Sequence, residues 1–356
     1  FFCLRIVERE GSMQIEDFLR EVTALPGLTG NESPVAEYIA EAFRPLADEV
    51  TVDVMQNVTA RMKGTGPKVM FAAHADEIGL MVTAIEKDGS LRLNSVGGVD
   101  PRILPGMVVK VYGIETLTGV IGAKAPHLMT QEEREKNYRR ENLHVDLGLP
   151  HDEVIKKVRV GDLVQLEARF VKLQNGQIAT KTADDRACVA IMLRAMQLLQ
   201  NMKHQADLYF VATSQEEIGS HGAKTSAYAL DPDIGVALDV CHAVTPDAPK
   251  TRTHSLDAPV ASMGPFINPY LRSKLMEVAK QQNISVQTAV VPGGTSTDAD
   301  RIGVALRGVP TVLIELPLKY MHTTVETFDM HTLEECARLL ANFAAAVSPS
   351  WMEEIW

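Results

Sequence analysis

The chain has 356 residues, of which 46% are hydrophobic and 23% are charged, as in an ordinary folded protein with one large domain or a main domain that carries a smaller one. The formal net charge is −11, and no basic cluster is present that could bind nucleic acid. No apolar stretch approaches the ~20 residues of a membrane-spanning helix. We therefore expect neither nucleic acid nor a membrane as a partner.

The first twelve residues precede Met13 and lack the small-residue cleavage site of a signal peptide. We expect residues 1–12 to be an upstream extension or a fusion junction outside the fold. The cysteines lie far apart without C-x-x-C spacing, which indicates reduced thiols and a cytoplasmic protein. They are Cys3, Cys188, Cys241 and Cys336.

Two amphipathic helices open the predicted fold. From Met13 the apolar residues recur at helical spacing until Pro26, and Ser33 is the expected N-cap of a second helix with Pro34 in its first turn. Strands follow at 50–54, 68–73, 78–85 and 91–93, where apolar residues alternate or form short runs.

Residues 90–175 are rich in short valine-containing strands, Gly and Pro, with one polar helix at the capping box of Thr130 and Glu133. This composition and the short strands predict an inserted small domain that resembles a β-barrel. The larger domain would then comprise 13–89 and 176–347, followed by a tail at 348–356.

After Asp184, strands alternate with helices. The expected strands are 207–213, 234–239, 285–291 and 311–316, and the expected helices are 186–202, 221–230, 269–282 and a last helix from a capping box of Thr332 and Glu335 to about residue 347. This order predicts an α/β fold with a mixed, largely parallel sheet and helices on both faces.

Histidines and carboxylates gather at the predicted strand ends, where ligands bind in open α/β sheets. Imidazole and carboxylate groups suit zinc, cobalt or manganese. One zinc needs about three protein ligands, whereas five candidates suffice for two ions if one carboxylate bridges, and we expect Asp184 to be the bridge. The five candidates are His74, Asp184, Glu217, Asp239 and His322.

Each of these features has a structural explanation when it is taken singly. A Glu-Glu pair is usually a solvated turn, and an Asp-Asp pair before a helix is usually an N-cap. Their convergence on one edge of the predicted sheet favours a functional site. The remaining polar candidates keep the structural explanation: Cys241, His242, His221 and His254.

Six motifs occur in a specific order: AHADEIG at 73–79, KTADDR at 181–186, QEEIG at 215–219, LDV at 238–240, STDA at 296–299 and YMHTTVE at 320–326. Over about residues 13–347 the chain resembles the tetrahedral aminopeptidase family, which comprises the glutamyl and deblocking aminopeptidases and is often labelled cellulase or endoglucanase. The resemblance implies a zinc-exopeptidase-like fold and peptide substrates. It also implies a homo-oligomer in which dimers build a twelve-subunit shell.

The resemblance further implies two divalent metal ions per chain, zinc or cobalt foremost and otherwise manganese. His74 and Asp239 would bind one ion, Glu217 and His322 the other, and Asp184 both. Glu216 matches the general base and Asp76 the carboxylate that orients His74. General chemistry agrees, because water shared by two cations is acidified and a neighbouring carboxylate can move its proton. The Asp184-Asp185 peptide is expected to be cis.

The sequence departs from the family pattern at Cys188, at Ser296 and at Thr323-Thr324. None of these changes removes a candidate ligand. The last two lie in loops near the expected substrate site, so they bear on specificity.

Several other functions stay open beside the aminopeptidase. A metallo-carboxypeptidase or an N-acyl-amino-acid deacylase would use the same ions and base, and a non-catalytic metal-binding scaffold would need no base. A glycoside hydrolase needs two carboxylates ~5 to 9.5 Å apart across a sugar bond. Glu216 and Glu217 fit that role poorly, because neighbours in an extended segment point in opposite directions, and only 5% of the residues are aromatic.

Overall fold

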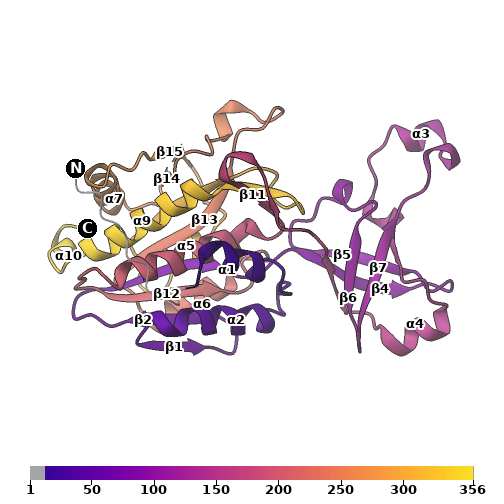
Figure 1. Ribbon diagram of the computed structural model, residues 1–356, viewed down its shortest axis with the longest axis horizontal. Coiled ribbons are helices and arrows are strands. Elements are labelled where there is room, and N and C mark those ends of the chain that lie inside the picture. Colours follow the sequence, from indigo (N-terminus) through magenta and orange to yellow (C-terminus); the bar gives the residue numbers. More distant parts are fainter. Residues whose placement is uncertain (1–12, 356) are drawn as a thin grey trace.

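The computed structural model describes residues 13–355, apart from the side chain of residue 140. The expectation for residues 1–12 lies outside the described residues. Figure 1 shows two parts, a large sheet with its helices and a smaller β-barrel that projects from one end of it.

The large sheet has eight strands in the order β1-β2-β12-β3-β13-β16-β14-β15. The four central strands, from β12 to β16, run parallel, whereas β1, β2 and β14 join the sheet through antiparallel pairs. The predicted mixed, largely parallel sheet is therefore confirmed. Its strands are β1 Glu49–Val52, β2 Val58–Met62, β3 Lys68–His74, β12 Asp207–Thr213, β13 Ile234–His242, β14 Val260–Met263, β15 Gln287–Val290 and β16 Thr311–Leu318.

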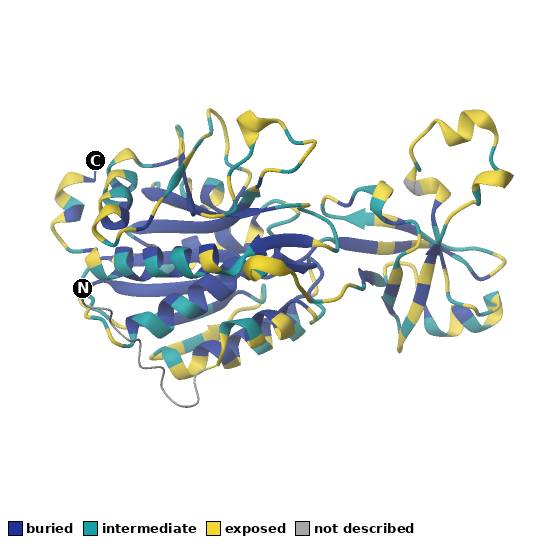
Figure 2. Ribbon diagram, turned by 45° about the horizontal axis from the view of Figure 1, so that its top comes forward, coloured by how far each residue is buried: buried dark blue, intermediate teal, exposed yellow. Residues whose placement is uncertain are grey.

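Helices cover both faces of this sheet, and the central strands are buried along their length (Figure 2). Helices α5 and α9 pack against each other on one face, and α6 and α8 pack against each other on the opposite face. Between these layers, Phe71 and Phe210 stack with ring centroids 4.8 Å apart. The helices of this part are α1 Ile15–Val22, α2 Ser33–Phe43, α5 Ala183–Leu199, α6 His221–Leu230, α7 Pro269–Gln281, α8 Ala299–Ile302, α9 Met330–Ala346 and α10 Trp351–Glu354.

Two predicted helix starts are wrong. The last helix begins at Met330, because Asp329 caps it by accepting hydrogen bonds from the backbone N–H groups of His331 and Thr332. Thr332, the predicted cap, donates its hydroxyl to the distant Leu256 carbonyl. Ser33 is the first residue of α2 rather than its N-cap.

The expected capping box of Thr130 and Glu133 is confirmed at the start of α3, Gln131–Arg134. The residues expected to form a C-terminal tail instead include the short helix α10. Its Trp351 is buried and packs edge-on against Phe343, with ring centroids 5.5 Å apart.

The smaller part is a closed barrel with the strand order β4-β5-β8-β7-β6-β9. Its own apolar core includes Val82, Val111 and Val164. The predicted insert begins too late at residue 90, because β4 pairs with β5 and β9 inside the barrel. The barrel strands are β4 Gly79–Ile85, β5 Leu91–Val96, β6 Val108–Tyr112, β7 Thr116–Gly122, β8 His144–Asp146 and β9 Leu163–Leu166.

A third sheet has three strands, two that follow the barrel in the chain and one that follows β16. They are β10 Val171–Lys172, β11 Gln177–Thr180 and β17 Glu326–Asp329. The barrel also carries helix α4, His151–Lys157. Among residues 13–355, none of the helices has the length and apolar character needed to cross a membrane.

Candidate metal centre

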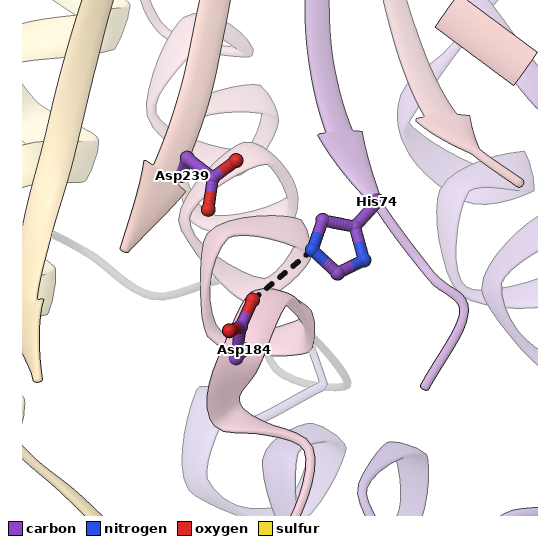
Figure 3. A group of neighbouring side chains, drawn as sticks. All are labelled: His74, Asp184 and Asp239. Carbon is purple, nitrogen blue, oxygen red and sulfur yellow. Dashed lines mark hydrogen bonds and ion pairs between the residues drawn. The ribbon is translucent and has the colours of Figure 1, made fainter. Parts of the chain in front are cut away.

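The five candidate ligands converge at the carboxyl ends of the central strands. His74 ends β3 and Asp239 lies in β13, while Asp184 lies in the first turn of α5. One ligand atom from each of these three residues lies within 4.8 Å of the others, and Figure 3 shows their side chains directed into one space. Asp184, Glu217 and His322 form a second group of the same kind. Asp184 therefore belongs to both groups.

The carboxylate of Asp184 faces both histidines. Its Oδ1 atom is 3.0 Å from Nε2 of His74, and its Oδ2 atom is 3.2 Å from Nε2 of His322. The same His322 nitrogen is 3.4 Å from Oε1 of Glu217. The peptide bond between Asp184 and Asp185 is cis, as predicted.

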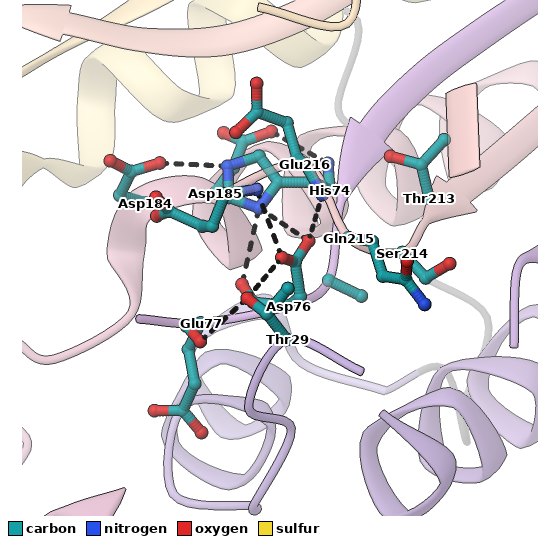
Figure 4. A network of polar contacts seen from close by, with 12 residues as sticks. Thr29, His74, Asp76, Glu77, Asp184, Asp185, Thr213, Ser214, Gln215 and Glu216 are labelled. Atoms are coloured by element: carbon teal, nitrogen blue, oxygen red, sulfur yellow. Dashed lines mark hydrogen bonds and ion pairs between the residues drawn. The ribbon is translucent and has the colours of Figure 1, made fainter. Parts of the chain in front are cut away.

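Asp76 links the imidazole of His74 to the loop after β12 (Figure 4). Its Oδ1 atom lies 3.4 Å from Nδ1 of His74, so Nε2 is directed at the candidate metal position. The same carboxylate accepts the backbone N–H groups of Glu216 at 3.0 Å and Glu217 at 3.2 Å. Thr29, which the sequence did not single out, donates its hydroxyl to Asp76 at 2.8 Å.

Glu216 lines the same cleft but belongs to neither ligand group. Its Oε1 atom accepts a hydrogen bond of 3.0 Å from the Ser220 hydroxyl. Burial raises the pKa of Glu216 above its usual value. This carboxylate is therefore placed beside the ligands with an environment that favours proton uptake.

Glu326 is a further residue of the site to which the sequence assigned no role. Its carboxylate accepts the backbone N–H of His322 at 2.8 Å and that of Asp184 at 3.0 Å, which ties two ligand segments together. On the other side of His322, Nδ1 contacts the Gly98 carbonyl at 3.0 Å. A Cβ atom at Gly98 would lie only 2.8 Å from that nitrogen, so a larger residue there would displace the imidazole.

The cluster holds more negative charge than its own cations neutralise. Burial, with repulsion from Asp184, raises the pKa of Glu217 to about 8, and burial with repulsion from Asp185 raises the pKa of Asp239. The hydrogen bond to Asp184 raises the pKa of His322 to about 9. Divalent cations would relieve this crowding, and the imidazole and carboxylate donors are the types that such ions bind. The donor set therefore fits a metal pair.

The cleft above the cluster has a volume of about 1010 Å³ and is large enough for a peptide end. Three residues to which the sequence analysis gave only a structural role line this cleft, namely Cys241, His242 and His254. Its lining also includes Glu315, which the sequence did not single out, although a lone glutamate within the apolar strand TVLIELPL is a detectable signal. Burial raises the pKa of Glu315 to about 7.

Residues 56–339 match the family described as M42 glutamyl aminopeptidase. The chain belongs to this family. It is 34% identical to the lysyl aminopeptidase of Pyrococcus furiosus, over 94% of this chain and 97% of that one. The M42 assignment confirms the resemblance found in the sequence and places the chain among the aminopeptidases.

Solved structures agree with the M42 assignment. An aminopeptidase from the archaeon Desulfurococcus kamchatkensis is 35% identical, with a TM-score of 0.90 over 96% of this chain and 97% of that one. The TET1 peptidase of Pyrococcus horikoshii, described as able to assemble into a tetrahedron or a large octahedral shell, is 29% identical, with a TM-score of 0.81 over 94% of this chain and 100% of that one.

Proposed function

We propose that this M42 chain is a metal-dependent aminopeptidase that uses two divalent ions and Glu216 to remove N-terminal residues from peptides. The observation that carries the proposal is the position of Asp184, which is shared by two groups of donor atoms, each within 4.8 Å. His74 and Asp239 would complete one ion site, and Glu217 and His322 the other. Zinc and cobalt suit these donors best, and manganese is also compatible.

When bound, such a metal pair acidifies water and polarises the scissile carbonyl. Glu216 accepts the proton of the attacking water and delivers it to the leaving amine. The Ser220 hydroxyl, 3.0 Å from Oε1 of Glu216, holds this carboxylate at the edge of the cleft. Burial raises the pKa of Glu216 above its usual value, which favours the uptake of the proton from water.

Asp76 acts as a positioning residue. Its backbone carbonyl lies 3.3 Å and its carboxylate 3.4 Å from Nδ1 of His74, and by accepting the Nδ1 proton it would fix the tautomer that leaves Nε2 free to bind a cation. It also accepts hydrogen bonds from the backbone N–H groups of Glu216 and Glu217, which holds the proposed base and a proposed ligand close to His74.

The family match favours an aminopeptidase over the carboxypeptidase, deacylase and glycoside hydrolase alternatives. No second function is favoured by a particular contact of the described residues. The relatives' names differ in the N-terminal residue that they specify, lysyl in one and glutamyl in another. The N-terminal residue that this chain prefers must therefore be inferred from the side chains of its own cleft.

We also infer that the chain forms a homo-oligomer, a dimer that builds a dodecamer, in the cytoplasm. The support is the similarity to a peptidase described as a tetrahedral or octahedral shell. Enclosure of the active sites would restrict cleavage to peptides that can enter the chamber. Exposed apolar side chains on the barrel, among them Ile114, Val120 and Val160, offer surface for subunit contacts.

The test is hydrolysis of aminoacyl-p-nitroanilides by protein that has been stripped with a chelator and refilled with zinc, cobalt or manganese. We expect stripping to abolish activity and at least one of these metals to restore it. Full activity in the stripped protein would contradict metal dependence, and a refilled protein inactive on every substrate would contradict the aminopeptidase assignment.

A further inference from the structure

Glu315 lies in a row of residues that crosses the sheet through two of the proposed metal ligands. Asp239 and Glu315 are direct partners in the parallel register of β13 and β16. On its other side, β13 pairs with β3, and Ala237 lies opposite Ala72. Two residues further along both strands, the same register brings Asp239 opposite His74. Partners in adjacent strands point to the same face, and the strands lie ~4.8 Å apart. Glu315 is thus one strand beyond Asp239 on the floor of the same cleft.

The carboxylate of Glu315 has a hydrogen-bond donor but no cation. The Ser262 hydroxyl donates to its Oε2 atom at 2.6 Å, and no Lys, Arg or His whose side chain the structure describes forms an ion pair with it. Only 7% of Glu315 is exposed. A buried carboxylate without a countercharge is costly, so a cationic ligand group would be stabilised there.

The cleft that contains Glu315 has apolar as well as polar side chains in its lining. Phe266, Val291 and Val304 line the cleft, and Phe266 and Val304 expose 39% and 61% of their surface. A long aliphatic stem with a terminal charge could pack its methylene groups on apolar parts of the cleft while its charge reaches Glu315. The two arginines of the cleft lining, Arg252 and Arg301, are exposed, and Arg301 already donates to the Gly219 carbonyl.

We propose that Glu315 is a specificity-determining residue that selects peptides with an N-terminal lysine or arginine. This inference rests on the proposed function, because the side chain of the N-terminal residue enters this part of the cleft only when the scissile bond lies at the metal centre. The negative floor disfavours N-terminal Asp and Glu for the same electrostatic reason.

The test compares wild type with Glu315→Gln, which has the same size and can still accept the Ser262 hydroxyl. The measured quantity is the ratio of kcat/KM for lysyl- and arginyl-p-nitroanilide to that for leucyl-p-nitroanilide. We expect a wild-type ratio of about ten or more and a fall of about tenfold in the variant, as for loss of a buried charge partner. Glu353→Gln, the same change at an exposed position, should keep the wild-type ratio.

A binding measurement separates this inference from the proposed function. L-lysine and L-norleucine have the same side-chain length, but only lysine carries the ammonium group. Calorimetry on the metal-loaded wild type should show tighter binding of lysine, by about tenfold or more, and Glu315→Gln should bind the two alike.

A wild type without a preference for basic residues in either assay would overturn the inference, even if Glu315→Gln failed to fold. So would a variant that lost activity on the basic and leucyl substrates in parallel. Hydrolysis of none of the substrates, together with selective binding of lysine, would contradict the proposed function and leave Glu315 as a recognition site for a cationic side chain.

Discussion

At the scale of single residues, Asp184 is the group on which the two proposed ion sites depend. It is the only member common to both donor groups found among residues 13–355. Hydrogen bonds from His322 and His74 keep its pKa low despite burial, so it stays ionised and available to cations.

We predict that Asp184→Asn disturbs both ions, because both sites share this carboxylate. Metal analysis of the purified variant should show a loss at both sites, whereas Asp152→Asn, at a side chain that is 90% exposed, should keep the wild-type metal content. If Asp184→Asn retained one full equivalent, the bridging role would be wrong.

Glu216→Gln should keep the metals and lose on the order of 10²-fold or more in kcat, the usual contribution of a positioned acid–base group. The amide has nearly the same shape and can still accept the Ser220 hydroxyl, but it cannot take up a proton. Metal analysis and steady-state kinetics on one preparation measure both effects. Near-normal turnover would mean that another group acts as the base.

The candidate ligands could be predicted from the sequence because strand patterns locate the strand ends, where ligands collect. The roles of Glu315 and Glu326 were missed for a physical reason, although the apolar strand around Glu315 offered a signal. Each residue has a partner more than 50 residues away in the chain, Ser262 for Glu315 and Asp184 for Glu326, and such pairings appear only when the elements are placed in space.

At the scale of elements, the ligands are carried by segments that other residues hold together. Glu326, at the first position of β17, accepts N–H groups from the segment of His322 and from the start of α5. Burial raises the pKa of this carboxylate. The order of the metal site therefore depends on the contact between β17, α5 and the loop after β16.

We predict that Glu326→Gln lowers metal affinity by about 10- to 100-fold, the usual effect of losing a partner that orients the ligands. Glutamine can offer one oxygen, and its amide group would face the second N–H donor. Competition with a chelator measures the affinity. As a control, Glu334→Gln changes an ion pair between α9 and Arg194 of α5 and should leave the metal affinity unchanged. If Glu326→Gln bound metal as tightly as the wild type, Glu326 would not be needed to position the ligands.

The element boundaries show where local patterns suffice. Helix 221–230 and the capping box of Thr130 and Glu133 match the predictions, because their signals are local. The start of α9 was missed because Thr332 bonds to Leu256 instead of capping. Strand β4 was assigned to the larger domain because apolar alternation does not reveal which strand is the partner.

At the scale of the whole molecule, the α/β fold and the added barrel could be predicted from the order of the elements, because this order is compatible with few topologies. The assembly depends on surfaces that only a second copy completes. Light scattering on the metal-loaded protein should give a mass of at least twice 39.0 kDa, and for the dodecamer about twelve times that mass. A monomer would contradict the homo-oligomer, and a stable dimer would contradict the shell.

The most direct test of the two-ion aminopeptidase is a titration of the stripped protein with zinc or cobalt while the hydrolysis of an aminoacyl-p-nitroanilide is followed. The shared position of Asp184 in two donor groups predicts that activity rises until two equivalents per chain are bound and then stays constant. Full activity at one equivalent, or activity that never depends on the added metal, would contradict the account.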